Sequence, residues 1–203
     1  MIQGKPTISA GNTKIGRIAN LNLPPPVTCA DLPCLKEGCY AMKSYSRWPS
    51  NQKSWHNNYD AFQANPSAFF EHIILTIQRK RNPIHYFRWH SAGEIPNQNY
   101  VAGMIRVALA FPHIKFLAFT KRYNYDFTGC PSNLQIVFSS WPGLRIPKKV
   151  LENHFVAWMN DGTQDRRIKE HKQPSKDCAG SCVKCKACWN LDKLGRDVVF
   201  HKH

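Results

Sequence analysis

The sequence lacks several features that would place it outside ordinary globular proteins. No run of about 18 apolar residues occurs in it, so we expect no membrane span. Charged residues make up only 20% of the 203-residue chain and hydrophobic residues 42%, which argues against a disordered polyelectrolyte and allows a packed core. Residues 1–6 contain no apolar signal segment, so we expect a cytoplasmic protein. No pattern in the sequence predicts an oligomeric state.

Acidic residues are scarce. The chain has 13 Asp and Glu against 28 Lys and Arg, which gives a formal net charge of +15. Lys and Arg bind phosphate groups, so nucleic acid is a candidate partner. The alternative is a generally basic surface. Part of the positive charge could also balance the thiolates of a metal site.

The cysteines fall into two tight groups. Four lie within eleven residues near the carboxyl end: Cys178, Cys182, Cys185 and Cys188. Three lie near the front of the chain: Cys29, Cys34 and Cys39. Cys130 stands alone, and we interpret it as a core residue. Disulfides fit this pattern poorly, because neighbouring thiols make strained bridges and the cytosol keeps thiols reduced.

Clustered reduced cysteines are typical of metal sites. The compact spacing of the rear group favours a 4Fe–4S cluster, and structural zinc is the alternative. The front group supplies three thiols, which would leave one metal position open, unless these cysteines are simply small buried hydrophobes. The sequence therefore predicts one or two 4Fe–4S clusters, and it leaves open whether the two groups form one site or two.

Hydrophobic periodicity alternates between strands and helices. We expect strands in five segments: 13–23, 84–89, 114–119, 134–138 and 154–159. We expect helices over 52–64, over 98–110 with Leu109 facing inward, and from a cap at Asn65 to about Arg79. This order predicts an α/β fold, either a partial (β/α) barrel or an open, mostly parallel sheet. Residues 1–164 would form the α/β core with the front cysteine loop, and residues 165–203 a cysteine-rich carboxyl-terminal lobe packed on it.

Polar residues follow the expected strands at their carboxyl ends, where functional groups of parallel sheets gather. They are Cys29–Cys39, His90–Glu94, Thr120–Arg122, Ser139–Ser140 and Asn160–Asp161. His90 and Glu94 are candidates for acid–base or cofactor contacts, with a capped, solvated turn as the alternative. Arg88 lies inside an apolar strand, so its charge should pair with a carboxylate, a phosphate or a cofactor carboxylate.

An ordered set of motifs resembles the phage "gene product 88" family. The set comprises the front cysteines with Tyr40, the segment 88–94 (Arg-Trp-His-Ser-Ala-Gly-Glu), the segment Phe119-Thr120-Lys121, and the terminal cysteines with Trp189. The resemblance covers most of the chain. It implies a phage-type protein located in the host cell cytosol.

The element order also resembles a shortened radical S-adenosylmethionine enzyme. In that family three cysteines after the first strand bind three irons of a 4Fe–4S cluster, and the fourth iron binds the amino and carboxylate groups of S-adenosylmethionine. Cys29, Cys34 and Cys39 occupy that place, although their x4, x4 spacing departs from the usual x3, x2.

This second resemblance implies roles for further residues. Gly93 and Glu94 match the turn that binds the amino group of the cofactor. The other implied cofactor contacts are Arg88, Thr120, Ser139 and Ser140. The catalytic candidates are Glu94, His90 and Lys121. The sequence thus predicts an iron–sulfur protein, a small phage- or plasmid-type redox or radical enzyme. The alternative is a basic nucleic-acid-binding protein with structural zinc or iron–sulfur sites.

Overall fold

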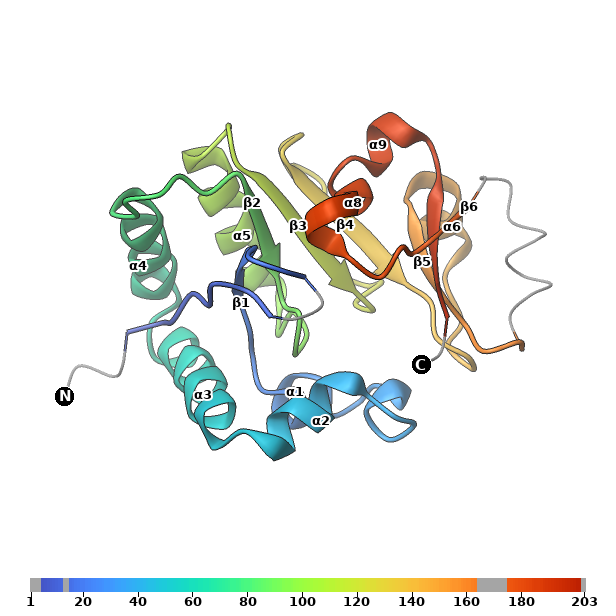
Figure 1. Ribbon diagram of the computed structural model, residues 1–203, viewed down its shortest axis with the longest axis horizontal. Helices are drawn as coiled ribbons and strands as arrows, with labels where there is room; N and C mark the ends of the chain where they lie inside the picture. The colour runs from blue at the N-terminus through green and yellow to red at the C-terminus, as the bar shows by residue number, and fades with distance from the viewer. Residues whose placement is uncertain (1–4, 13–14, 164–174, 202–203) are drawn as a thin grey trace.

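The computed structural model describes residues 5–12, 15–163 and 175–201. Its centre is an open sheet in which all seven described strands run parallel (Figure 1). The strand order is β1 (Ala19–Leu21), β2 (Tyr86–Trp89), β3 (Lys115–Thr120), β4 (Leu134–Ser139), β5 (Val156–Asn160), β7 (Asp197–His201) and β6 (Ser175–Asp177). Because neighbouring strands are parallel, their carboxyl ends lie at one edge of the sheet.

Four helices cover one face of the sheet, here called the outer face. They are α3 (Pro49–Ala64), α4 (Pro66–Gln78), α5 (Gln98–Ala110) and α6 (Lys148–Asn153). Asparagine side chains start two of them: Asn65 accepts a hydrogen bond from the Ala68 amide at 2.9 Å and Asn97 one from the Tyr100 amide at 3.1 Å. Alternate strand residues such as Trp89 and Phe116 pack against these helices, so one apolar layer joins sheet and helices.

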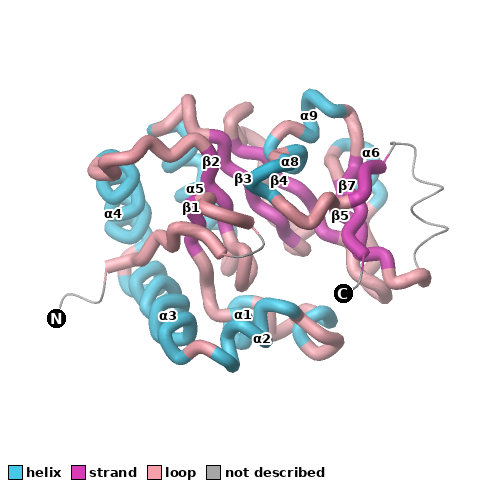
Figure 2. The backbone as a smooth tube through the Cα atoms, in the orientation of Figure 1, coloured by secondary structure: helices cyan, strands magenta, loops and turns pink. Residues whose placement is uncertain are grey.

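The carboxyl-terminal segment covers the opposite face, here called the inner face. It contains α8 (Cys182–Cys185), η2 (Ala187–Trp189) and α9 (Leu191–Leu194), which lie across the sheet in Figure 2. Trp189 is buried against Leu117 and Val137, and its indole N–H donates to the Phe87 carbonyl at 3.1 Å. Both faces of the sheet are therefore covered, as parallel sheets require.

The front cysteines lie beyond the carboxyl edge of the sheet, among short helices. These are α1 (Pro25–Thr28), η1 (Pro33–Leu35) and α2 (Tyr40–Arg47), drawn below the strands in Figure 1. Among the described helices, none combines the length and the apolar character of a bilayer span.

The structure confirms the α/β class and the open parallel sheet, and it corrects several details. The opening strand is only Ala19–Leu21, and residues 13 and 14 lie outside the described residues. Leu109 was expected to face inward but is 62% exposed, because Met104, Val107 and Ala108 supply the buried stripe of α5. The expected boundary between residues 164 and 165 lies outside the described residues, so the division into core and lobe stays a prediction.

Candidate functional site

A cavity of about 320 Å³ opens at the carboxyl edge of the sheet. Ten of the residues expected at the site line it: Cys29, Cys34, Cys39, Arg88, His90, Gly93, Glu94, Lys121, Ser139 and Ser140. These residues come from four separate segments, so the fold gathers them. Thr120, Asn160 and Asp161 do not line the cavity, although the Thr120 hydroxyl donates to Glu94 at 2.8 Å.

The front cysteine loop packs its thiols inward. Cys29 and Cys34 are buried, next to Leu32 and partly buried Trp141. Burial raises the pKa of Cys29 to about 12, and the nearby carboxylate of Glu94 adds to the rise. Burial also raises the pKa of Cys34, while the ammonium of Lys121 lowers it. Both thiols are therefore neutral at pH 7 in the metal-free protein, and a metal that bound them would release protons.

A tight turn follows β2 and depends on Gly93. Its φ of +87° favours glycine, and a Cβ there would lie 2.5 Å from the carbonyl oxygen of Leu23. The Leu23 amide in turn donates to the Ala92 carbonyl at 3.1 Å. The turn therefore packs against the segment that follows β1. This contact orients the side chain of Glu94 toward the cavity.

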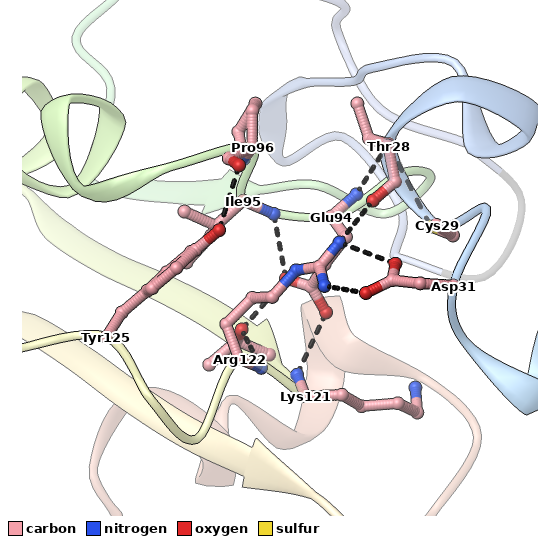
Figure 3. A network of polar contacts seen from close by, with 10 residues as sticks. Thr28, Cys29, Asp31, Glu94, Ile95, Pro96, Lys121, Arg122 and Tyr125 are labelled. Carbon is pink, nitrogen blue, oxygen red and sulfur yellow. Dashed lines mark hydrogen bonds and ion pairs between the residues drawn. The ribbon is translucent and has the colours of Figure 1, made fainter.

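The carboxylate of Glu94 is held in one orientation (Figure 3). Oε1 accepts from the Ile95 amide and the Thr120 hydroxyl, each at 2.8 Å, and Oε2 accepts from the Lys121 amide at 2.9 Å. The residue is only 4% exposed. A carboxylate offers about four acceptor positions, so one position remains for a ligand after these three bonds.

His90 is buried at the end of β2. Its Nε2 lies 3.0 Å from the Tyr100 hydroxyl, and its Nδ1 has no hydrogen-bond partner among the described residues. Burial lowers the pKa of His90 to about 3, and the positive charge of Arg88 contributes. His90 is therefore neutral near pH 7. The alternative of a solvated turn is wrong, because both His90 and Glu94 are buried.

Arg88 projects from β2 on the inner face and is 9% exposed. Its guanidinium lies 4.8 Å from the ring centroid of Phe119, and its Nε has no hydrogen-bond partner in the described part of the chain. No ion pair to it is found among residues 5–12, 15–163 and 175–201. Burial raises the pKa of Cys188 and the positive charge of Arg88 opposes this rise, so Arg88 lies near both the cavity and the rear cysteines.

Lys121 and Trp141 lie next to each other in the lining of the cavity. The Lys121 ammonium lies 5.7 Å from the Trp141 ring centroid, and the Trp141 indole donates to Glu37 at 2.8 Å. This arrangement closes one side of the front cysteine loop. Ser140 is buried beside it, and its amide donates to the Ala157 carbonyl at 2.8 Å.

The rear cysteines lie on the inner face, away from the lining of the cavity. Cys178, Cys182 and Cys188 pack against the apolar cluster of that face, and Cys185 is exposed. Burial raises the pKa of Cys188 to about 12; Arg88 lowers it, and the other three rear thiols add to the rise. The four thiols are therefore close enough to interact electrostatically.

Neither cysteine group is a preformed metal site. Within the residues that the structure describes, no three or more His, Cys, Asp or Glu side chains are arranged as ligands of one ion. The front thiols nevertheless share one cavity, and this donor set fits a metal group held by three thiolates with one position open. The assignment of the seven cysteines as ligands stays a prediction.

Comparison with known proteins identifies the family. A family profile described as Gene product 88 matches residues 3–191. The chain belongs to the gene product 88 family of phage proteins. Searches of curated proteins and of solved structures gave no match. The first resemblance in the sequence is confirmed, and the resemblance to radical S-adenosylmethionine enzymes remains without support from these comparisons.

The structure of this gene product 88 protein also shows roles that the sequence did not predict. Arg122 ties the front loop down, because its guanidinium donates to the Thr28 carbonyl at 2.8 Å and to Asp31 at 2.9 Å (Figure 3). The sequence places Arg122 directly after Lys121 at the end of an expected strand, and this was a signal for a role at the site. No signal in the sequence identified its partner Asp31, which lies 91 residues away.

Two buried asparagines fix the turn after β2 in the same protein. Asn22 accepts from the Ser91 hydroxyl at 2.9 Å and from the Ala92 amide at 3.1 Å, and it donates to Asn20 at 2.8 Å. Asparagine is depleted in strands, so two of them at the end of the first strand were a signal for such a network.

Proposed function

We propose that this gene product 88 protein is an iron–sulfur protein of radical S-adenosylmethionine-like architecture, a small redox or radical enzyme of the cytosol. One observation carries the proposal. Three thiols, a glycine-dependent turn with a fixed carboxylate, and two consecutive serines at the end of β4 line a single cavity at the carboxyl edge of a parallel sheet. This juxtaposition is expected of an enzyme site and is hard to explain by packing alone.

Cys29, Cys34 and Cys39 would hold the front cluster, and the rear four cysteines a second cluster or a structural zinc. Such a cluster, when bound, supplies single-electron chemistry at its open iron. The chain itself supplies the ligand contacts. The remaining acceptor position of Glu94 suits an ammonium group, and the guanidinium of Arg88, to which no ion pair is found among the described residues, suits a carboxylate.

These two groups bear opposite charges on the same cavity. A zwitterion such as the methionine part of S-adenosylmethionine carries the matching pair of charges. The fixed carboxylate of Glu94 loses little freedom when it binds an ammonium, because three hydrogen bonds already hold it. Neutral His90 next to Arg88 adds no further positive charge at pH 7.

Metal analysis after anaerobic purification tests the proposal. We expect iron and acid-labile sulfide in equal amounts, with about four to eight irons per chain for one or two cubane clusters. Stoichiometric zinc without sulfide would refute an iron–sulfur protein. Cys34→Ser should lower the iron content by about half if two clusters exist. Cys130→Ser is the matched control, since Cys130 lies apart from both groups and should leave the iron content unchanged.

Electron paramagnetic resonance tests the ligand separately. S-adenosylmethionine added to the reduced protein should change the cluster signal, and Glu94→Gln should weaken that change because it removes the charge that attracts the ammonium group. Glu152→Gln, an exposed change on α6, is the control. A cluster signal that ignores the added ligand in the unmodified protein would remove S-adenosylmethionine from the proposal and leave a redox role.

A further inference from the structure

Helix α2 carries a basic and aromatic stripe that the cavity chemistry does not use. Tyr40, Lys43 and Arg47 are spaced three and four residues apart, so they lie on one face of the helix. Trp48 follows directly. All four side chains are exposed, with Tyr40 at 54% and Trp48 at 51%. We call these four residues the α2 stripe.

Exposed aromatic rings are rare in this protein. In the part of the chain that is described, Tyr40 and Trp48 are the only aromatic residues among the large hydrophobic side chains that are exposed. The Tyr40 hydroxyl donates to the Ser91 carbonyl, which holds the ring at the cavity. The Arg47 guanidinium lies over the Trp48 ring, 5.2 Å from its centroid, so the positive charge and the ring are already neighbours.

The charge of the α2 stripe is not compensated along the chain. Residues 38–59 contain no Asp or Glu, but they include Lys43, Arg47 and Lys53. No ion pair of Lys43 or Arg47 is found among the described residues. The nearest acidic residue before the stripe in the sequence is Glu37, and its carboxylate accepts a hydrogen bond from Trp141.

We infer that the α2 stripe binds single-stranded nucleic acid and leads it to the mouth of the cavity. Lys43 and Arg47 supply contacts to two phosphates, and Tyr40 and Trp48 supply rings on which unpaired bases stack. Eight helical residues span about 12 Å, the length of three to four stacked nucleotides at about 3.4 Å each. Tyr40 and Lys43 themselves line the cavity, so the bound strand ends there.

Two features favour a single strand over the other polyanions. Paired bases hide their faces inside a duplex, where these rings cannot reach them. A membrane surface would need an apolar helix face turned outward, whereas Ala41 of α2 is buried in the protein and Ser44 and Ser46 separate the basic residues. The inference goes beyond the proposed function and does not depend on any metal.

Binding of a labelled single-stranded oligonucleotide of about 12 nucleotides, followed by anisotropy at low salt, tests the inference. Lys43→Gln with Arg47→Gln should weaken binding at least about tenfold and flatten the salt dependence by roughly 1.4 in log–log slope, as expected for two lost phosphate contacts. The control, Lys80→Gln with Arg81→Gln, removes the same charge from exposed positions after α4 and should have less than about a third of that effect.

A second pair of variants tests base stacking. Trp48→Ala should weaken binding at least about fivefold, and Trp48→Phe should restore most of it, because stacking needs a ring and not an indole. If the variant of Lys43 and Arg47 and the control variant of Lys80 and Arg81 lose equal binding affinity, the α2 stripe is not the binding site. Absence of oligonucleotide binding, tighter duplex binding, or stripe-dependent binding to anionic phosphatidylserine vesicles alone would overturn the inference as well. The iron content is measured in parallel. It tests the iron–sulfur proposal separately, because oligonucleotide binding by the α2 stripe does not depend on a metal.

Discussion

The buried imidazole of His90 predicts a loss of stability in mild acid. Its pKa is lowered from 6.5 to about 3 in the folded protein, chiefly by burial and secondly by Arg88. The unfolded chain therefore binds a proton at this residue below about pH 6.5, whereas the folded chain does so only near pH 3. Stability contributed by neutral His90 is complete above pH 6.5 and falls as the pH drops toward 3.

The size of this effect follows from the two pKa values. Between about pH 8 and about pH 5, a histidine with these values lowers the free energy of unfolding by about 2 kcal/mol. Other titrating groups add their own pH dependence, so the contribution of His90 must be isolated by difference. His90→Asn does this, because asparagine tolerates the positive φ of 54° at this position and does not titrate.

Urea denaturation of both proteins at about pH 8 and pH 5 measures the difference. The variant loses the bond to Tyr100 at both pH values, but it should lose about 2 kcal/mol less than the original protein on acidification. His113→Asn, at an exposed position, controls for the substitution. If His90→Asn and the original protein lose equal stability between the two pH values, the folded protein protonates His90 readily and the argument from burial is wrong.

Three further substitutions test other parts of the structure. Gly93→Ala places a Cβ 2.5 Å from a backbone oxygen at positive φ, so denaturation should show a loss of about 2 kcal/mol or more; a loss below about 0.5 kcal/mol would contradict the tight turn. Arg122→Met removes the bonds to Asp31, so hydrogen exchange in residues 28–36 should become about tenfold faster while the sheet keeps its protection; unchanged exchange would contradict this anchor. Asp197→Ala removes the side-chain acceptor of the buried Trp158 indole and of the Val156 amide, so denaturation should show a loss of about 3 kcal/mol; an unchanged midpoint would show that these two hydrogen bonds do not stabilise the protein.

Local patterns in the sequence were sufficient for strands β1 to β5 and for the three longest described helices, α3, α4 and α5. The aromatic and β-branched residues around Phe87 predict their strand, and the helical spacing of Ile73, Ile74 and Ile77 predicts their helix, because both signals depend only on neighbouring residues. Asn65 predicts the start of α4 for the same local reason. Parallel order then places the ends of the strands at one edge, so the lining of the cavity by His90, Glu94 and Ser139 was within reach of the sequence.

Contacts between distant segments could not be predicted in this way. Strand β7 pairs with β5 and β6 pairs with β7, but Asp197–His201 shows little in its sequence that says which strand it joins. The pairing of Arg122 with Asp31 spans 91 residues, and no local rule fixes it.

Arg88 shows the division between sequence and tertiary structure most clearly. The sequence determined that a charge lies in an apolar strand and predicted an anionic partner for it, but no ion pair to Arg88 is found in the described part of the chain. Only the tertiary structure decided where that charge acts. The carboxyl-terminal segment packs on the inner face next to β2, and the guanidinium therefore lies near both the cavity and Cys188. The physical reason is that burial and electrostatic interaction depend on distances in space, which the order of residues along the chain does not fix.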